Sequence, residues 1–371
     1  MLGPTGGGLG AEPAGDNGGR GPQGEIPVDG LTDRQIALIA RASGMSIDDT
    51  QAAAAASGPV LDFTLRHAND PEFGDLRVVT RNTFEVELRV TTAESKLPAE
   101  LESALGRKIR VSVGGRSNAA IQADYETTVA LLNKAQDNPA LKGVNFSVTR
   151  DFDLGAAVVD IGAERVATME DLVPKEVVVR GANAKIEFQE TSRSGMPMQM
   201  IFGGEHHCTM FSAQYENCNT HDRQVHITAD PWVTFGFYGY DGQWTNIRNV
   251  AGGIYNGQWV YRVSPGFSDE LSTVSYYTTY YFTVEDSGDI NDCLGWRQLE
   301  GLPLSASRIE GNYAEPGDSG GGNFLYYNDR WYAAGTTSLV WGRGTPSAHT
   351  VMAWRNIPSG WTVCSILYPC S

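Results

Sequence analysis

The sequence has few basic residues and no long apolar run. It carries 28 Lys and Arg against 44 Asp and Glu, which gives a formal net charge of −16. Nucleic acids are bound through basic patches that neutralise phosphates, and no such patch stands out here. No apolar run approaches the roughly 20 residues that a transmembrane helix needs. We therefore expect neither a nucleic-acid-binding protein nor an integral membrane protein.

Cysteine is scarce and occurs only late in the chain, at Cys208, Cys218, Cys293, Cys364 and Cys370. None of these residues forms a CxxC pair, so we expect no structural zinc site, and we expect no cofactor. Cys208 with Cys218 and Cys364 with Cys370 are spaced for short-loop disulfides, which would place the protein in an oxidising, extracellular compartment. The alternative is five reduced thiols in a cytosolic protein. The N-terminus lacks the apolar region of a signal peptide, so secretion would need another route or a start upstream.

Bulky apolar residues are almost missing from residues 1–30, which are rich in Gly and Pro. Such a segment cannot bury enough surface to offset the loss of chain entropy, and it predicts a flexible tail.

Residues 31–194 predict a small α+β unit. Thr32 and Gln35 form a T-x-x-Q capping box, and Gly44 marks the end of that helix. Ser46 begins a second, alanine-rich helix that we expect to end near Ser57-Gly58. Residues 84–90 alternate strictly between apolar and charged side chains, as in a half-buried strand. The remaining expected elements are a short helix after Pro98, a strand at 109–113, a helix at 119–136 and strands at 144–149 and 156–161.

Residues 195–371 have a different composition. Helical patterns nearly vanish, Tyr, Trp, Thr and Gly become frequent, and turn signals such as Tyr255-Asn256-Gly257 and Asn328-Asp329 recur. Many short strands joined by hairpins indicate a β-barrel or a β-sandwich.

The most informative segment is Ala314-Glu315-Pro316-Gly317-Asp318-Ser319-Gly320-Gly321-Gly322. Glycines on both sides of Ser319 allow a sharp backbone turn that leaves the hydroxyl exposed. Closely spaced backbone N–H groups can then converge on one point and form an oxyanion hole, which stabilises charge that develops on a carbonyl oxygen. The competing interpretation is a glycine-rich loop without chemistry.

This string resembles the nucleophile segment of chymotrypsin-like serine proteases, most closely the bacterial streptogrisin and α-lytic type. Gly203-Gly204-Glu205-His206-His207-Cys208 is similar to the start of the mature domain in that family. The resemblance implies an all-β chymotrypsin-like double β-barrel at 195–371, preceded by a pro-domain at 31–194 that assists folding. It implies Ser319 as nucleophile, the amides of Gly317 and Ser319 as oxyanion hole, and a protein or peptide substrate.

The other two triad positions depart from the family. Aligned on Thr228-Ala229, the histidine position holds Pro231, and the best match to the aspartate position holds Gly257. A serine hydroxyl is a poor nucleophile until a base takes its proton, and neither residue can serve. His226 is the candidate for a displaced base. A slip of five residues is odd, however, and would turn its side chain to the other face of a strand, so a strand or surface position without chemistry is the alternative.

Two further interpretations are weaker. His206, His207 and Cys208 could suggest a metal, but adjacent strand residues point apart. Ser319, Asp329 and His349 follow the triad order of α/β-hydrolases. That fold needs a helix after the nucleophile, whereas a strand and a turn follow Gly322.

Two functions therefore compete. One is a secreted serine endopeptidase that uses Ser319, with His226 as a displaced base. The other is a catalytically inactive homologue that binds peptides or proteins through the same cleft. The substitutions at Pro231 and Gly257 favour the second as a mechanism, and the Ser319 segment favours the first as a family.

Overall fold

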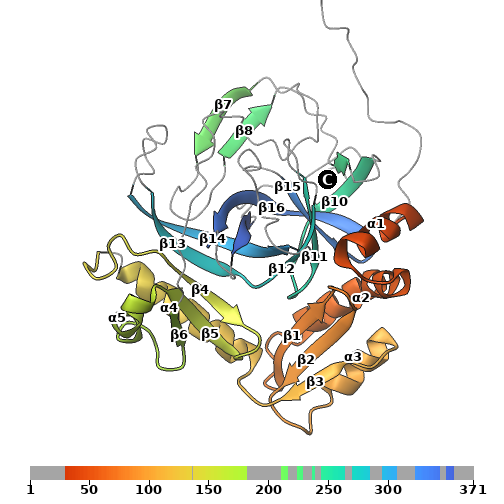
Figure 1. Cartoon of the computed structure of the whole chain (residues 1–371), viewed down its shortest axis with the longest axis horizontal. Helices are drawn as coiled ribbons and strands as arrows, with labels where there is room; N and C mark the ends of the chain where they lie inside the picture. The colour runs from red at the N-terminus through yellow and green to blue at the C-terminus, as the bar shows by residue number, and fades with distance from the viewer. Residues whose placement is uncertain are drawn as a thin grey trace, which may run out of the picture.

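The computed structural model describes residues 30–135, 137–181, 210–215, 224–228, 236–238, 244–263, 270–284, 295–306, 322–342 and 348–354. In this part of the chain, all helices lie between residues 33 and 170, and only strands occur from residue 210 onward (Figure 1). We call residues 30–181 the N-terminal unit and the described residues of 210–354 the β unit. The structure is thus mostly β-sheet with a few helices, and the helices all come first.

Two helices open the N-terminal unit, α1 (Asp33–Ser43) and α2 (Ile47–Arg66), and they pack on each other. The expected capping box is present. The Thr32 hydroxyl accepts a hydrogen bond from the Gln35 amide, and the Gln35 side chain accepts one from the Thr32 amide. Gly44 ends α1 in the left-handed conformation, as predicted. Both ends of α1 therefore satisfy backbone groups that would otherwise lack partners.

The prediction that the second helix ends near Ser57-Gly58 is wrong. α2 runs through Gly58 and Pro59 to Arg66, because the burial of its last apolar residues outweighs the tendency of Gly and Pro to end a helix. Gly58 also allows a close approach, since a Cβ there would lie 3.2 Å from Oδ1 of Asn328 in the β unit. The apolar residues buried after Gly58 are Val60, Leu61 and Phe63.

A three-stranded sheet follows. β1 (Phe73–Val79) pairs antiparallel with β2 (Glu85–Val90), and after α3 (Leu97–Leu105) the edge strand β3 (Arg110–Val113) adds parallel to β2. The predicted apolar face is confirmed, and its buried residues are Phe84, Val86, Leu88 and Val90.

The next segment repeats the same arrangement. Its elements are, in order, α4 (Asn118–Lys134), β4 (Phe146–Asp151), β5 (Ala156–Ile161), η1 (Ala163–Arg165), α5 (Val166–Glu170) and β6 (Val178–Gly181). As in the first segment, a helix precedes an antiparallel pair, and the third strand adds parallel to the second after a short helix. The N-terminal unit therefore contains two copies of one β-β-α-β arrangement, each preceded by a helix.

The β unit contributes the strands β7 (Met210–Tyr215), β8 (Gln224–Thr228), β9 (Gly236–Tyr238), β10 (Trp244–Val250), β11 (Trp259–Val263), β12 (Glu270–Val274), β13 (Thr278–Val284), β14 (Gly295–Ala306), β15 (Gly322–Tyr327), β16 (Arg330–Trp341) and β17 (His349–Trp354). β7 and β8 pair with each other in a separate sheet. The others join β4, β5 and β6 in a sheet of twelve strands, in the order β6-β5-β4-β13-β14-β12-β11-β15-β16-β10-β9, with β17 paired to β14 and β16.

Six of these strands form a circuit of pairings. β12 and β13 pair with one side of β14, and β17 pairs with the other side. From β12 the pairings continue through β11, β15 and β16 to β17, which leads back to β14. The predicted turn at Asn328-Asp329 joins β15 to β16, and both of its residues have positive φ.

The N-terminal unit and the β unit share one sheet and two hydrophobic cores. β4 pairs antiparallel with β13 (Figure 1). The rings of Phe146 and Tyr281 stack across that pairing, with their centroids 4.5 Å apart. The first core joins α1, α2, β1 and β2 to β-unit residues, and the second joins α4, β4 and β5 to Tyr281. The β-unit members of the first core are Tyr255, Trp259, Tyr261, Leu271, Phe324, Tyr326, Trp331 and Ala333.

Alternation along the strands separates two faces of the β unit. Trp259 and Tyr261 of β11 belong to the core shared with the N-terminal helices, whereas Val260 lies in a third core with β-unit residues alone. The same alternation holds on β15, where Phe324 is in the shared core and Leu325 in the third. The N-terminal unit therefore covers one face of β11 and β15.

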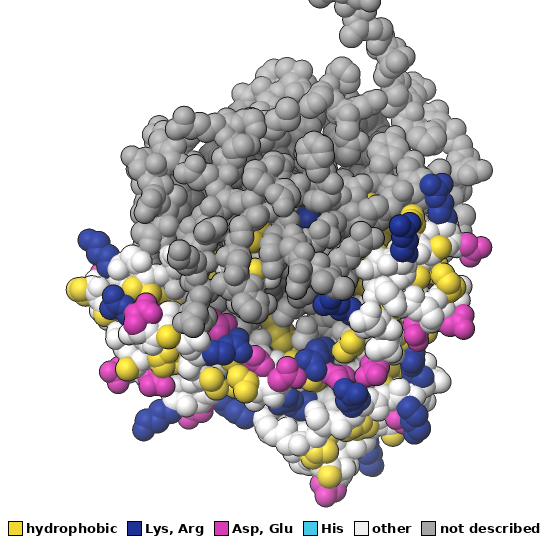
Figure 2. Space-filling model, viewed as in Figure 1, with side chains coloured by type: hydrophobic (Ala, Val, Ile, Leu, Met, Phe, Trp, Pro, Cys, Tyr) yellow, Lys and Arg dark blue, Asp and Glu magenta, His cyan; other side chains and the backbone are white. Residues whose placement is uncertain are grey.

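Charged side chains of both signs are mixed over the N-terminal unit in the view of Figure 2. In the part of the chain that the structure describes, no helix is both long and apolar enough to cross a membrane.

Candidate functional site

The Ser319 segment occupies the connection between β14 and β15. Ser319 and Gly317 lie outside the described residues, so their proposed roles stay predictions. β15 begins with Gly322 directly after this segment, and Gly322 pairs with Val263 of β11 and Thr336 of β16. The glycine-rich string is therefore joined directly to the six-strand circuit.

A buried polar group lies on the strands next to this entry point. Asn323 follows Gly322 and donates a hydrogen bond from Nδ2 to Thr337 Oγ1 at 3.1 Å. Its register partner on β11 is Arg262, whose Nη1 donates to Thr350 Oγ1 at 3.2 Å. All four side chains are buried, and Arg262 is only 2% exposed. Buried polar groups of this kind are tolerated because they are hydrogen-bonded, and they fix the register of the strands that carry them.

Sequence reasoning missed this group. Its one available signal was Arg262 itself, a charged residue within the otherwise apolar run Trp259-Val260-Tyr261-Arg262-Val263. Such a residue is more often a solvent-facing strand position than a buried one. The hydrogen bonds that make its burial possible come from β17 and could not be anticipated.

His226 lies on β8, where its backbone register partner is Ala213 of β7. The β7–β8 sheet is on the side of the large sheet away from the N-terminal unit (Figure 1). Since Ser319 and Pro231 lie outside the described residues, the pairing of His226 with Ser319 stays a prediction. The five cysteines also lie outside them, together with His206 and His207.

Gly257, which the sequence resemblance aligns with an aspartate position, lies against the N-terminal unit. It has φ +88°, and its amide donates to the Val274 carbonyl at 2.8 Å. The preceding Asn256 carbonyl accepts from the Val78 amide at 2.8 Å. A Cβ on Gly257 would lie 1.8 Å from the Val78 carbonyl oxygen, which no side chain tolerates. A carboxylate at this position is therefore incompatible with the observed contact to β1.

The alternative triad of Ser319, Asp329 and His349 is not assembled. Asp329 lies in the turn at the start of β16, whereas His349 pairs with Trp341 at the end of that twelve-residue strand. The Asp329 carboxylate accepts from the Tyr326 hydroxyl at 3.4 Å, and Nε2 of His349 is 2.9 Å from the Tyr280 hydroxyl oxygen. Because a strand rises about 3.3 Å per residue, these two side chains are too far apart to form the required pair.

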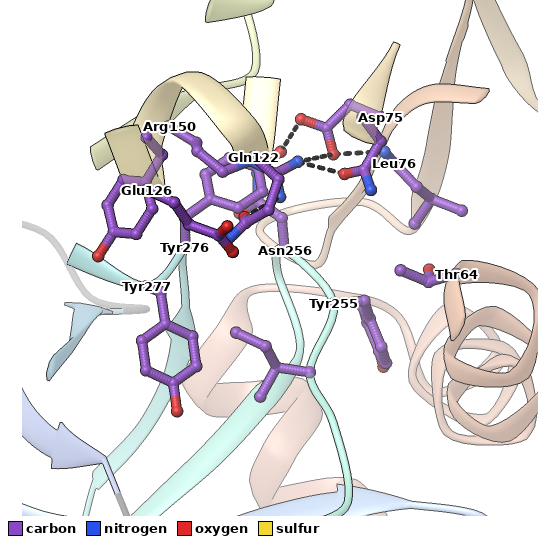
Figure 3. A pocket seen from close by; sticks show the side chains of 13 residues that line it. Thr64, Asp75, Leu76, Gln122, Glu126, Arg150, Tyr255, Asn256, Tyr276 and Tyr277 are labelled. Atoms are coloured by element: carbon purple, nitrogen blue, oxygen red, sulfur yellow. Dashed lines mark hydrogen bonds and ion pairs between the residues drawn. The ribbon is translucent and has the colours of Figure 1, made fainter. Parts of the chain in front are cut away.

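A pocket of about 380 Å³ opens where the two copies of the N-terminal arrangement meet the β unit (Figure 3). Its lining residues come from α2, β1, α4, β4 and the segments before β11 and β13: Thr64, Asp75, Leu76, Asn118, Gln122, Tyr125, Glu126, Arg150, Ile254, Tyr255, Asn256, Tyr276 and Tyr277.

Three of these residues form what we call the junction cluster: Asp75, Arg150 and Tyr276. Oδ2 of Asp75 accepts a hydrogen bond from the Tyr276 hydroxyl, and Oδ1 is 3.7 Å from Nη2 of Arg150. The Arg150 guanidinium also lies 4.7 Å from the centre of the Tyr276 ring. Burial raises the pKa of Asp75, and it also raises the pKa of Tyr276 well above its usual value.

The described residues contain no group of three or more His, Cys, Asp or Glu side chains placed to hold a metal ion. No protein-family model, curated protein or solved structure matches this chain. The function is therefore inferred from the Ser319 sequence motif and from the geometry of the described residues.

Proposed function

We propose that the chain is a protein of the chymotrypsin-like serine peptidase family, with Ser319 as nucleophile and the Gly317 and Ser319 amides as oxyanion hole. In this proposal residues 195–371 form the double β-barrel, and residues 31–194 are its pro-domain-like partner. The observation that carries the proposal is the position of the string Gly317-Asp318-Ser319-Gly320-Gly321-Gly322, which leads directly into β15 of the six-strand circuit.

The topology of the six-strand circuit supports the second, C-terminal barrel of the proposed double β-barrel. β11 pairs with β12 and β12 pairs with β14, while β13, which lies between β12 and β14 along the chain, pairs with the same side of β14 and continues the line of β12. β15 returns through the connection at 307–321 to lie beside β11. If β12 and β13 are counted as one interrupted strand, this order is 4-1-2-3, that of a Greek key, and small barrels are built in this way. The double barrel as a whole, including the part before β11, remains part of the proposal.

The chemistry needs a proton acceptor for the Ser319 hydroxyl. In peptide hydrolysis, Oγ attacks the scissile carbonyl carbon, its proton passes to the base, and the base then protonates the leaving amine. His226 is the proposed base. No side chain at position 257 can orient it, because the Val78 carbonyl fills that space.

The close contact between Gly257 and the Val78 carbonyl favours a second function, that of a homologue that binds peptides without cleaving them. A fold that retains Ser319 and the two amides but lacks an oriented base would bind a peptide without cleaving it at a useful rate. In serine proteases, loss of one triad member leaves roughly 10³–10⁴-fold catalysis over water. We therefore keep a peptide-binding homologue as the alternative function.

A fluorophosphonate probe separates the two functions. Its phosphorus is attacked by an activated serine Oγ with loss of fluoride, so stoichiometric labelling of the full chain, abolished by Ser319→Ala, supports the peptidase. Ser287 is a matched control, since it also lies in an Asp-Ser-Gly triplet, and Ser287→Ala should label like the wild type. Folded protein that does not label supports the binding homologue.

Secretion belongs to the same proposal. It predicts that Cys208–Cys218 and Cys364–Cys370 are disulfides in protein recovered from the medium, which peptide mapping under non-reducing conditions would show. Free thiols at all four positions would contradict it.

A further inference from the structure

The junction cluster joins three parts of the molecule through one carboxyl group. Asp75 belongs to β1 in the first copy of the repeated arrangement, and Arg150 belongs to β4 in the second. Tyr276 lies in the β unit, between β12 and β13. Figure 3 shows Asp75 and Arg150 directed toward each other above the pocket. A change in the charge of Asp75 therefore acts on both copies and on the β unit.

The surroundings of Asp75 are only partly suited to a charged carboxylate. Its side chain is buried, and the favourable groups are the Tyr276 hydroxyl, the Leu76 amide at 2.8 Å, Arg150 and, at longer range, Arg89 of β2. Arg150 is shared, because it also donates to Gln122 at 3.1 Å and to Asn118. Desolvation outweighs these groups and raises the pKa of Asp75.

The pocket gives the cluster a route to water. Asp75, Arg150 and Tyr276 all line it, and Glu126 of α4 lies exposed among its lining residues. Gln122 donates to Glu126 at 3.0 Å, which links the second carboxylate to the same face of α4. A proton can therefore reach Asp75 without unfolding of either unit.

We propose that the junction cluster is a pH-responsive contact that holds the N-terminal unit on the β unit most firmly when Asp75 is protonated. The direction follows from linkage. The carboxyl of the unfolded chain titrates near its ordinary pKa of 3.8, and that of the folded chain titrates at a higher pH. The stabilisation by Asp75 is therefore complete below pH 3.8 and is lost as the pH rises through the folded pKa.

Hydrogen exchange of the full chain tests this contact directly. The Val78 amide bonds to the Asn256 carbonyl across the junction, so its exchange reports opening of the junction. As the pH rises, we expect the opening constant of the wild type, divided by that of Asp75→Asn, to increase by up to tenfold per pH unit. Above the folded pKa of Asp75 this ratio should become constant. Comparison at equal pH cancels the intrinsic pH dependence of exchange, and the Leu88 amide within β2 should show no such change.

A matched control is Asp153→Asn, which removes a carboxylate whose side chain is 76% exposed and paired with Arg77. It should keep the pH profile of the wild type. A constant ratio between wild type and Asp75→Asn across pH 4–8, or a ratio that changes in the opposite direction, would overturn the proposal.

Tyr276→Phe provides a second test should Asp75→Asn fail to fold. Removal of a hydrogen bond that favours the charged carboxylate raises the pKa of Asp75 further, so the pH range in which the junction weakens should move upward. An unchanged range would also overturn the proposal. The result does not depend on probe labelling of Ser319, so failure of this inference and failure of the proposed function are distinguishable.

Discussion

At the scale of single residues, Gly257 shows how an interface can determine a side chain. Its positive φ and the nearby Val78 carbonyl both require glycine. The family resemblance presents this residue as a lost aspartate. In the structure Gly257 has a packing role. Because it has no Cβ, β1 approaches the β unit closely enough for the Val78 amide to donate a hydrogen bond to the Asn256 carbonyl.

Gly257→Ala should therefore weaken the junction. The methyl group cannot fit without movement of backbone, and we expect a loss of about 3 kcal/mol in the free energy of unfolding, measured by denaturant titration. Gly252→Ala is the control, since nothing lies within 4 Å of a Cβ there. Equal stability of the two variants would show that the contact is unimportant.

His226→Ala tests the proposed base. If His226 takes the proton of Ser319, this variant should lose nearly all probe labelling and peptide turnover while its circular dichroism stays that of the wild type. Activity retained in His226→Ala would reject His226 as the base without affecting the assignment of Ser319.

At the scale of elements, the sequence predicted those that carry local signals. The capping box of α1 and the alternation in β2 depend on neighbouring residues, and both predictions are confirmed. The extension of α2 was missed because burial against the β unit overrides Gly58-Pro59. β1 and β6 were also missed, and each pairs with the neighbouring strand of its own segment. The pairing of β4 with β13 joins residues far apart in the chain, and no local pattern encodes it.

Among the contacts between elements, loss of the β4–β13 pairing should reduce the stability of the protein most. Phe146 is fully buried on β4 and stacks on Tyr281 of β13, so Phe146→Ala removes packing on both sides of the boundary. We expect a cost of about 3–5 kcal/mol in chemical denaturation. Leu154→Ala, at a position in the β4–β5 turn that is 50% exposed, should change stability little. A small effect of Phe146→Ala would mean that the two units fold independently.

At the scale of the whole molecule, the two units are not separate bodies joined by a linker. Eight β-unit residues belong to the core that also contains α1, α2, β1 and β2. Burial of this extent is typical of a domain interior rather than of a transient contact, so the N-terminal unit contributes directly to the stability of the β unit.

Residues 195–371 produced alone should therefore refold poorly, with a low yield of soluble protein. Addition of residues 31–194 as a separate chain should raise that yield, because it covers the shared aromatic face. Efficient refolding of 195–371 without help, followed by light scattering and near-ultraviolet circular dichroism, would contradict a folding role for the N-terminal unit.

The β4–β13 pairing has one more consequence. Any cleavage or opening that parts the units leaves two bare strand edges, one on each piece, with unpaired backbone donors and acceptors. Each edge is then a template for self-association, so separated pieces should aggregate unless they reunite or bind another strand. Separation of the two units therefore requires protection of the exposed edge of β13.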